Sequence, residues 1–316
     1  MSKRFIDLHR EFLQLLEQKE WKKALILSEK AEVLYREKIY YTSFWKSCLL
    51  AQLNQPTEAL TQLKLAMEQG VWWNPETLLT EEMLSSIKDK EEFQKIVQIC
   101  KQRWQEQQKR SLPQLYVIGN NKDKTAILSL HWRKDNARDF AEYWKNEELL
   151  KQYIFGFAQS SQVRGYETFC WDDKETAIKD IEHLYHLFQN NYLTKENEII
   201  LAGASQGGKL AIELALSHPA MKVKGFIVVV PAIKDLGEFE QLLASKTVQN
   251  VPGYMIAGRK DRFYDQTEKL CRLLKDYGIH CELYVDEHEG HMFPKHFPKL
   301  LAEAIHFIDQ SNGKDA

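Results

Sequence analysis

A serine lies between glycines in the stretch Gly203-Ala204-Ser205-Gln206-Gly207-Gly208, directly after an apolar run over residues 198–202. This is the G-x-S-x-G pattern between a strand and a helix, in which a sharp turn presents the serine hydroxyl to a substrate. Glycine two residues before and two after the serine avoids the collisions that bulkier side chains would cause there. The first turn of the following helix would supply N–H groups for a developing oxyanion. The pattern predicts a nucleophile of acyl transfer at Ser205.

A serine hydroxyl is a weak nucleophile until a base accepts its proton. In this arrangement an acidic residue and then a histidine follow the serine along the chain. Asp261 and His291 each follow a predicted strand in that order, so we predict that His291 is the base and Asp261 orients it. The competitors are less suitable, because Asp265 falls in a predicted helix as a surface charge and His288 lacks the preceding glycine that would permit a tight approach.

The elements that would position these residues begin after Pro113. Apolar runs predict strands over residues 115–118, 125–130, 154–158, 198–202, 226–230, 253–257 and 281–285. Helical periodicity predicts helices over residues 137–152, 175–189, 206–217, 266–277 and 299–309. Apolar strands separated by helices favour an α/β fold, a doubly wound and mostly parallel sheet covered on both faces. Reactive groups in such sheets gather at the carboxyl ends of the strands.

The first 110 residues differ, since only Gly70 of the 14 glycines lies there. Apolar residues recur at helical spacing, and Lys23-Ala24-Leu25 with Ala31 matches Glu58-Ala59-Leu60 with Ala66 after 35 residues. This resembles a short, degenerate tetratricopeptide repeat, whose period is about 34 residues. Asn54-Gln55-Pro56 would be a turn between paired helices, and a third pair would span residues 81–107. We predict a tetratricopeptide-like helical domain over 1–110 and a catalytic α/β domain over 111–316.

Composition excludes several classes of function. The 43 Lys and Arg residues nearly balance the 45 Asp and Glu residues, which offers no electrostatic footprint for nucleic acid. No secretory signal and no apolar stretch of about 18 residues is seen, so we expect no membrane span. The five scattered cysteines form no Cys-x-x-Cys pair and indicate neither a zinc site nor a redox pair. We expect a cytoplasmic protein that uses no metal.

From residue 115 to 309 the chain resembles the α/β-hydrolases. It is most similar to the phospholipase/carboxylesterase group, which includes the acyl-protein thioesterases. The resemblance is carried by Gln206 after the serine, by the closing Gly290-His291, and by the stretches His131-Trp132-Arg133-Lys134-Asp135-Asn136 and Cys170-Trp171-Asp172-Asp173. It implies a serine esterase without a cofactor, in which the backbone N–H groups of Gln206 and Arg133 hold the oxyanion.

One loop departs from the pattern of that group. The group usually has His-Gly-x-Gly-Asp, whereas Trp132 and Lys134 stand here at the two glycine positions. If those glycines provide a positive φ or a close backbone approach, a tryptophan should be strained or should reshape the loop. Two interpretations stay open. Either the oxyanion hole is weakened, or Trp132 lines the substrate pocket, for which the other candidates are His131, Trp171 and Phe293.

These patterns lead to one main hypothesis and two alternatives. The main hypothesis is a serine hydrolase that cleaves a carboxylic ester or thioester of a small or acyl substrate through an acyl-enzyme. The first alternative is a peptidase-like α/β-hydrolase. The second is a non-catalytic scaffold, in which the helical region binds a protein partner. That region could equally be an intramolecular cap on the following domain.

Overall fold

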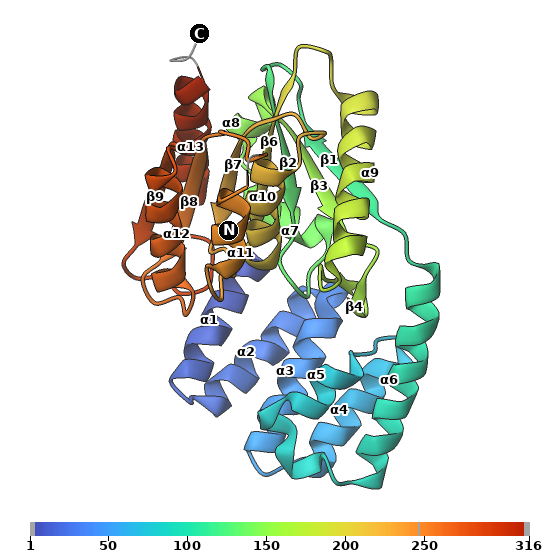
Figure 1. Ribbon diagram of the computed structural model, residues 1–316. Helices are drawn as coiled ribbons and strands as arrows, with labels where there is room; N and C mark the ends of the chain where they lie inside the picture. The colour runs from blue at the N-terminus through green and yellow to red at the C-terminus, as the bar shows by residue number, and fades with distance from the viewer. Residues whose placement is uncertain (1–3, 246, 313–316) are drawn as a thin grey trace. The chain divides into compact units, whose positions relative to one another are not determined.

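The computed structural model describes residues 4–245 and 247–312, which form two compact units (Figure 1). One runs to Ser111 and also includes Val163–Thr168, and we call it the helical unit. The other comprises Leu112–Gln162 and the chain from Phe169 onward, and we call it the sheet unit. None of the described helices is both long enough and apolar enough to cross a bilayer.

The helical unit is built from α1 (Phe5–Glu17), α2 (Trp21–Leu34), α3 (Ile39–Gln52), α4 (Pro56–Glu68), α5 (Pro75–Thr80) and α6 (Glu91–Arg110), with 3-10 turns η1 (Arg36–Lys38) and η2 (Glu82–Ile87). Helices α1 to α4 pack successively on one another. Small residues are buried where they meet, namely Ala24, Ala31, Ala59 and Ala66. The predicted turn lies between α3 and α4, where Asn54 has a φ of 60° and Pro56 opens the next helix. In place of a third helix pair, the 3-10 turn η2 precedes the long helix α6.

A short segment from the middle of the chain completes the helical unit. It contains β4 (Val163–Gly165), which pairs with β5 (Thr168–Phe169) in a separate two-stranded sheet. The backbone N–H of Val163 donates to the Gln108 side chain at 2.8 Å, and its carbonyl accepts from the Trp104 indole at 2.8 Å. The backbone N–H of Tyr166 donates to the Trp72 carbonyl at 3.2 Å. These bonds tie the segment to α6 and to the chain between α4 and α5.

The sheet unit contains a seven-stranded sheet in the order β1-β3-β2-β6-β7-β8-β9. Its strands are β1 (Gln114–Gly119), β2 (Thr125–Leu130), β3 (Ile154–Gln159), β6 (Glu198–Ala204), β7 (Val223–Val229), β8 (Gly253–Gly258) and β9 (Cys281–Asp286). Only the edge strand β1 is antiparallel to its neighbour, and the other pairs are parallel. The predicted mostly parallel sheet is therefore confirmed.

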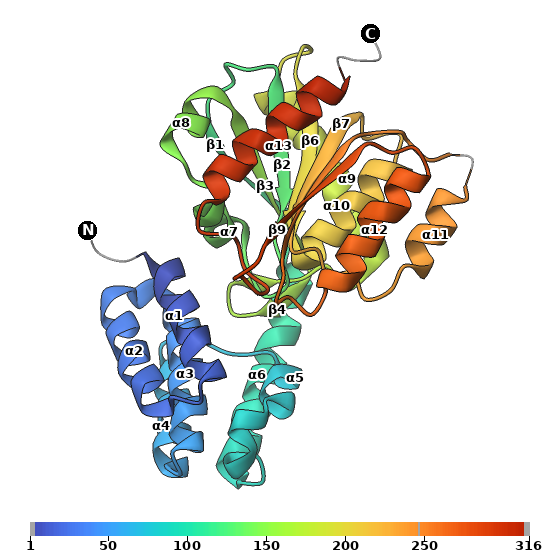
Figure 2. The ribbon, with the colours of Figure 1, turned by 90° about the vertical axis from the view of Figure 1, so that its left-hand side faces the viewer.

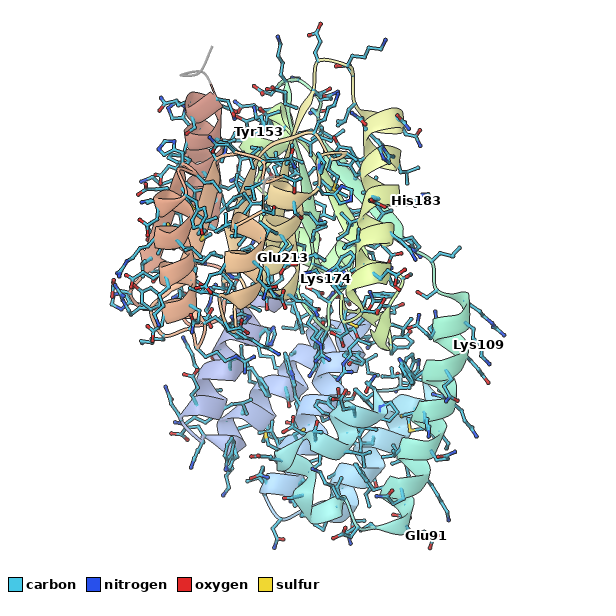
Figure 3. All side chains as sticks on the ribbon, viewed as in Figure 1. Glu91, Lys109, Tyr153, Lys174, His183 and Glu213 are labelled. Carbon is cyan, nitrogen blue, oxygen red and sulfur yellow. The ribbon has the colours of Figure 1, made fainter. Side chains whose placement is uncertain are left out.

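Helices cover both faces of the sheet (Figure 2). Apolar residues of α9 (Lys174–Tyr192), α10 (Ser205–Ser217), α11 (Gly237–Leu243) and α12 (Tyr264–Asp276) join one core cluster. Those of α7 (Ala137–Trp144), α8 (Glu147–Gln152) and α13 (Phe297–Asn312) join the other. On the first face the buried Glu213 of α10 pairs with Lys174 of α9 at 2.9 Å (Figure 3). Because both faces are covered by helices, reactive loops are expected at the carboxyl ends of the parallel strands.

The single helix predicted over 137–152 is wrong in one respect, because the structure has two helices there. Lys145 is extended, and the Asn146 side chain accepts hydrogen bonds from the N–H groups of Glu148 and Leu149. An asparagine that caps a new helix competes with continuation of the previous one. The helix α11 had no counterpart in the sequence prediction.

Candidate active site

Ser205 lies where β6 ends and α10 begins. Its φ of 50° is in the left-handed region, which is a strained conformation for a residue with a side chain. The turn is as crowded as the sequence predicted, since a Cβ on Gly203 would lie 2.7 Å from the backbone of Gly207. A Cβ on Gly207 would lie 2.4 Å from the Leu130 carbonyl oxygen at the end of β2. Both glycines are therefore required for this turn to form.

The three predicted members of a triad lie together. The Nε2 atom of His291 is 2.8 Å from Ser205 Oγ, and its Nδ1 atom is 2.8 Å from Asp261 Oδ2. A carboxylate can only accept a hydrogen bond, so Nδ1 carries the proton and Nε2 is the acceptor for the serine hydroxyl. The Asp261 side chain is only 2% exposed, whereas the His291 side chain is 31% exposed. The arrangement can transfer the serine proton to the imidazole.

The ends of two strands position Asp261 and His291. Asp261 follows β8 and accepts a hydrogen bond at Oδ1 from the N–H of Phe263, which directs its other oxygen to the imidazole. His291 follows β9, and the ring of Phe263 packs edge-on against it at 5.5 Å. The two competing residues lie elsewhere, since Asp265 is exposed on α12 and His288 is exposed in the turn after β9.

The loop over residues 131–136 is predicted to donate one oxyanion N–H, and for that prediction we call it the oxyanion loop; it contains the two positions where glycine was expected. Lys134 has a φ of 71°, so this position does need the left-handed conformation that glycine favours. Trp132 does not have a positive φ, so a left-handed conformation is not what this position requires. The N–H of Lys134 donates to the Phe169 carbonyl at 2.9 Å, and the N–H of Phe169 donates to the Asp135 carbonyl at 2.8 Å. These bonds fix the loop to the end of β5.

A carboxylate to which the sequence assigned no role lies at the centre of this region. Asp172 accepts two hydrogen bonds from the Arg133 guanidinium, at 2.8 and 2.7 Å, and one from the Gln206 side chain at 2.8 Å. The N–H of Trp171 donates to Gln206 Oε1 at 3.0 Å. Burial alone would raise the pKa of Asp172, but the hydrogen bonds from Arg133 and Gln206 outweigh it and lower the pKa to about 2. Asp172 is therefore ionised at neutral pH.

Three of the four residues predicted to line a pocket are buried in the core. The His131 ring stacks on Trp171 at 4.8 Å, and the Trp171 indole donates to the His131 carbonyl at 2.8 Å. Phe293 is also buried, while Trp132 is half-buried and packs against Phe293 and Tyr143. Among the four, Trp132 alone has a partly exposed side chain.

His131 has a structural role that its sequence position did not reveal. Its Nδ1–H donates to the Trp132 carbonyl at 2.7 Å, and its Nε2 accepts from the N–H of Ser160 at 3.4 Å. Burial lowers the pKa of His131 to about 4, so the ring is neutral and can accept at Nε2. The histidine joins the start of the oxyanion loop to the end of β3.

Metal-binding groups are a separate question. Within residues 4–245 and 247–312, no three His, Cys, Asp or Glu side chains are grouped so that they could hold a metal ion. His183 is exposed on α9 (Figure 3).

Two protein-family models match separate parts of the chain. One is described as the N-terminal domain of A/B hydrolase-like proteins and matches residues 4–108. The other is described as serine aminopeptidase, S33, and matches residues 154–288. The second range contains Ser205 and Asp261 and ends before His291. No curated protein matches the chain.

Solved structures resemble different shares of the chain. An uncharacterized protein from Bacillus cereus is 26% identical, with a TM-score of 0.54. The match covers 98% of this chain and 100% of that protein's chain. Esterase PE8 is 19% identical, with a TM-score of 0.53, over 62% of this chain and 99% of its own. The acyl-protein thioesterase 2 of Zea mays is 14% identical, with a TM-score of 0.48, over 62% of this chain and 98% of its own.

Together with the sheet topology, the two family models establish the fold. The chain has an α/β-hydrolase fold with a mixed, mostly parallel seven-stranded sheet, preceded by an all-helical region. The fold is shared with an esterase.

Proposed function

We propose that the chain is a serine hydrolase that cleaves a carboxylic ester or thioester of a small or acyl substrate through an acyl-enzyme. The observation that carries this proposal is the pair of 2.8 Å hydrogen bonds that link Ser205 to His291 and His291 to Asp261. The left-handed turn at Ser205 supports it, because strain of this kind is stored at functional sites. The shared fold with esterase PE8 favours an ester as the substrate class.

Each residue has a defined task in the proposed reaction. Ser205 Oγ attacks the carbonyl carbon while His291 Nε2 takes its proton, and the carbonyl oxygen becomes an oxyanion held by the backbone N–H groups of Gln206 and Arg133. The alcohol or thiol then leaves with the proton from His291, and Ser205 remains acylated. Water, activated by His291, then attacks the carbonyl carbon of the acyl-enzyme, and the carboxylic acid is released from Ser205. Asp261 holds the imidazole in one tautomer and stabilises its charged form.

Trp132 is the proposed contact for the acyl group. It lies next to Arg133 in the oxyanion loop, it is partly exposed, and its ring packs edge-on against those of Tyr143 and Phe293. A rigid aromatic side chain beside the oxyanion donors would limit the length or width of the acyl group. This position favours a specificity role for Trp132 over a weakened oxyanion hole.

A second candidate function is aminopeptidase activity. The family model that matches residues 154–288 is described as a serine aminopeptidase, and the same triad chemistry can cleave an amide. The amine of an amide is a poor leaving group and must be protonated as it departs. The protonated imidazole of His291 would supply that proton. The two candidates therefore differ in substrate and share one nucleophile.

The proposal also includes a partner-binding role for the helical unit and a cytoplasmic location. Helices α2 and α4 carry buried alanines at matching positions, which supports a tetratricopeptide-like repeat that binds a protein partner. All five cysteines are buried free thiols, which supports the reducing cytoplasm as the compartment.

A fluorophosphonate probe tests the nucleophile directly. We expect the probe to label the wild-type protein and to fail on Ser205→Ala, while Ser217→Ala, an exposed serine at the end of the same helix, is labelled normally. Turnover of p-nitrophenyl acetate, an acyl thioester and an aminoacyl p-nitroanilide then separates the two candidates. Absence of labelling and of turnover in the wild-type protein would refute both and leave the scaffold hypothesis.

A further inference from the structure

We propose that Asp172 is a positioning residue that fixes both backbone donors of the oxyanion hole. The inference rests on the proposed function, in which the N–H groups of Arg133 and Gln206 hold the oxyanion. It concerns how those two groups are kept in place before a substrate arrives. The residue would act through its neighbours and would not itself touch the substrate.

The side chains of both proposed donors converge on this one carboxylate. Arg133 comes from the oxyanion loop after β2, Gln206 from the first turn of α10, and Asp172 from the chain after β5. Arg133 Nε donates to Oδ1 at 2.8 Å, and Arg133 Nη2 donates to Oδ2 at 2.7 Å. Gln206 Nε2 donates to Oδ1 at 2.8 Å. Two segments that must stay in register are thus joined through a third.

The segment that carries Asp172 is itself held firmly. The carbonyl of Gln162 accepts from the N–H of Cys170 at 3.0 Å, and the Gln162 side chain bonds both the N–H and the carbonyl of Asp173, at 2.7 and 2.9 Å. Asp173 also caps α9 through the N–H of Thr176. The chain is therefore anchored at Cys170 and at Asp173, on either side of Asp172, so the carboxylate is a fixed point for Arg133 and Gln206.

The chemistry of the contact suits this task. A guanidinium bound through two parallel hydrogen bonds is fixed in orientation as well as in position, which a single contact would not achieve. The low pKa of Asp172 keeps the carboxylate charged over the whole range in which an imidazole base is neutral. The side chains of Arg133 and Asp172 are 37% and 39% exposed, so salt will weaken the pair in part.

The contact of Asp172 with Arg133, which we call the clamp, acts on a loop that departs from the glycine pattern of the resembled group. With Lys134 in the left-handed conformation and a tryptophan at residue 132, the loop lacks glycine at both expected positions. We infer that the loop backbone at residue 133 is held through the Arg133 side chain, which is bonded to Asp172. Donors fixed in advance stabilise the transition state more than the bound substrate, so their loss lowers kcat and leaves KM largely unchanged.

The test compares Asp172→Asn and Asp172→Ala with Asp173→Asn. The control removes a carboxylate charge from the adjacent residue and keeps the helix cap, because asparagine caps as well as aspartate does. For p-nitrophenyl acetate we expect kcat to fall about 10- to 100-fold in both Asp172 variants, with KM within about 3-fold. Binding of a trifluoromethyl ketone, whose adduct bears an oxyanion, should weaken by a similar factor. The control should stay within about 3-fold in every measurement.

A double-mutant cycle tests whether Asp172 acts through Arg133. We expect the fall in kcat caused by Asp172→Ala to be at least about 3-fold smaller in the Arg133→Ala background than in the wild type, since the arginine contact is already lost. Equal costs in both backgrounds would overturn the clamp, even if kcat fell. The number of active sites, titrated with the fluorophosphonate, corrects every kcat for unfolded protein.

Failure of this inference differs from failure of the proposed function. If the wild-type protein neither reacts with the probe nor turns over any ester or amide, the proposed function is refuted. If the wild-type protein is active and the Asp172 variants keep its kcat and its affinity for the ketone, the clamp alone is refuted. A fall in kcat that disappears after active-site titration would also count against the clamp.

Discussion

Gly258 lies so close to Gly290 that a Cβ at residue 258 would sit 2.4 Å from the Gly290 carbonyl oxygen. The same Cβ would sit 2.5 Å from the carbonyl oxygen of Glu289. The turn that carries Asp261 and the turn that carries His291 therefore touch through their backbones. Gly290 itself is not crowded, since the nearest atom to its Cβ would be the Lys260 carbonyl oxygen at 3.9 Å. The close approach belongs to the first of these glycines, although the sequence had suggested the second.

Gly258→Ala should separate the acid from the base. We expect a loss of about 1 to 3 kcal/mol in the free energy of unfolding, or a displaced His291 turn with kcat lowered at least about 10-fold. Gly290→Ala is the matched control, because its Cβ meets no close atom. Urea unfolding and ester turnover of the two variants measure the difference. Equal behaviour of both variants would contradict the role of Gly258.

Asp261→Asn should lower kcat for p-nitrophenyl acetate by about three to four orders of magnitude, because an amide cannot hold the imidazole tautomer that leaves Nε2 free to accept. Asp265→Asn, an exposed residue in the next helix, should keep the wild-type rate. The two rates are compared after active-site titration. A small effect at Asp261 would mean that another group orients His291.

Trp132→Gly should change selectivity rather than the basal rate, because Trp132 does not occupy a left-handed conformation that glycine would relieve. We expect kcat/KM for p-nitrophenyl octanoate to rise about 10-fold relative to that for the acetate. Trp132→Phe should shift the preference less. A rise in acetate turnover with unchanged chain-length preference would instead indicate that the tryptophan weakens the oxyanion hole.

Lys134→Gly should stabilise the protein by up to about 1 kcal/mol, since glycine adopts the left-handed conformation without steric cost. Lys134→Ala keeps the Cβ and should give no such gain. Urea unfolding of both variants against the wild type checks this. Equal stability of the two variants would show that the strain is relieved elsewhere.

His131 should make the protein sensitive to acid. Its pKa is about 4 in the folded state against about 6.5 for an exposed histidine, so below pH 6.5 the unfolded chain binds a proton that the folded chain does not. The free energy of unfolding should therefore fall as the pH drops from 6.5 towards 4. His131→Gln, which cannot be protonated, should show a smaller fall between pH 7.5 and pH 5.0 in urea unfolding. Equal falls in variant and wild type would contradict the assignment.

The sequence was sufficient for those parts of the site that depend on local pattern and strand order. Ser205, Asp261 and His291 each follow an apolar strand, and the parallel topology brings such strand ends together. The crowding at Gly203 and Gly207 follows from the shape of one turn, which their spacing already encodes. These residues could be predicted without knowing how distant segments pack.

Other features depend on packing between distant segments. Asp172 meets Arg133 and Gln206 across three separate pieces of chain, and no spacing rule connects them. The burial of His131 and Trp171 likewise depends on how their rings stack on one another, which no local sequence pattern specifies. Strands as short as β4 and β5 carry no periodicity that a sequence pattern could detect.

The short segment Val163–Thr168 makes the helical unit a discontinuous domain. A fragment that starts at Leu112 would keep this segment and lose Trp104 and Gln108, to which Val163 is bonded. Removing the first 111 residues is therefore not a clean deletion, since it strands a piece of the removed unit inside the remaining one. An exchange of helical units between relatives would have to transplant two pieces of chain together.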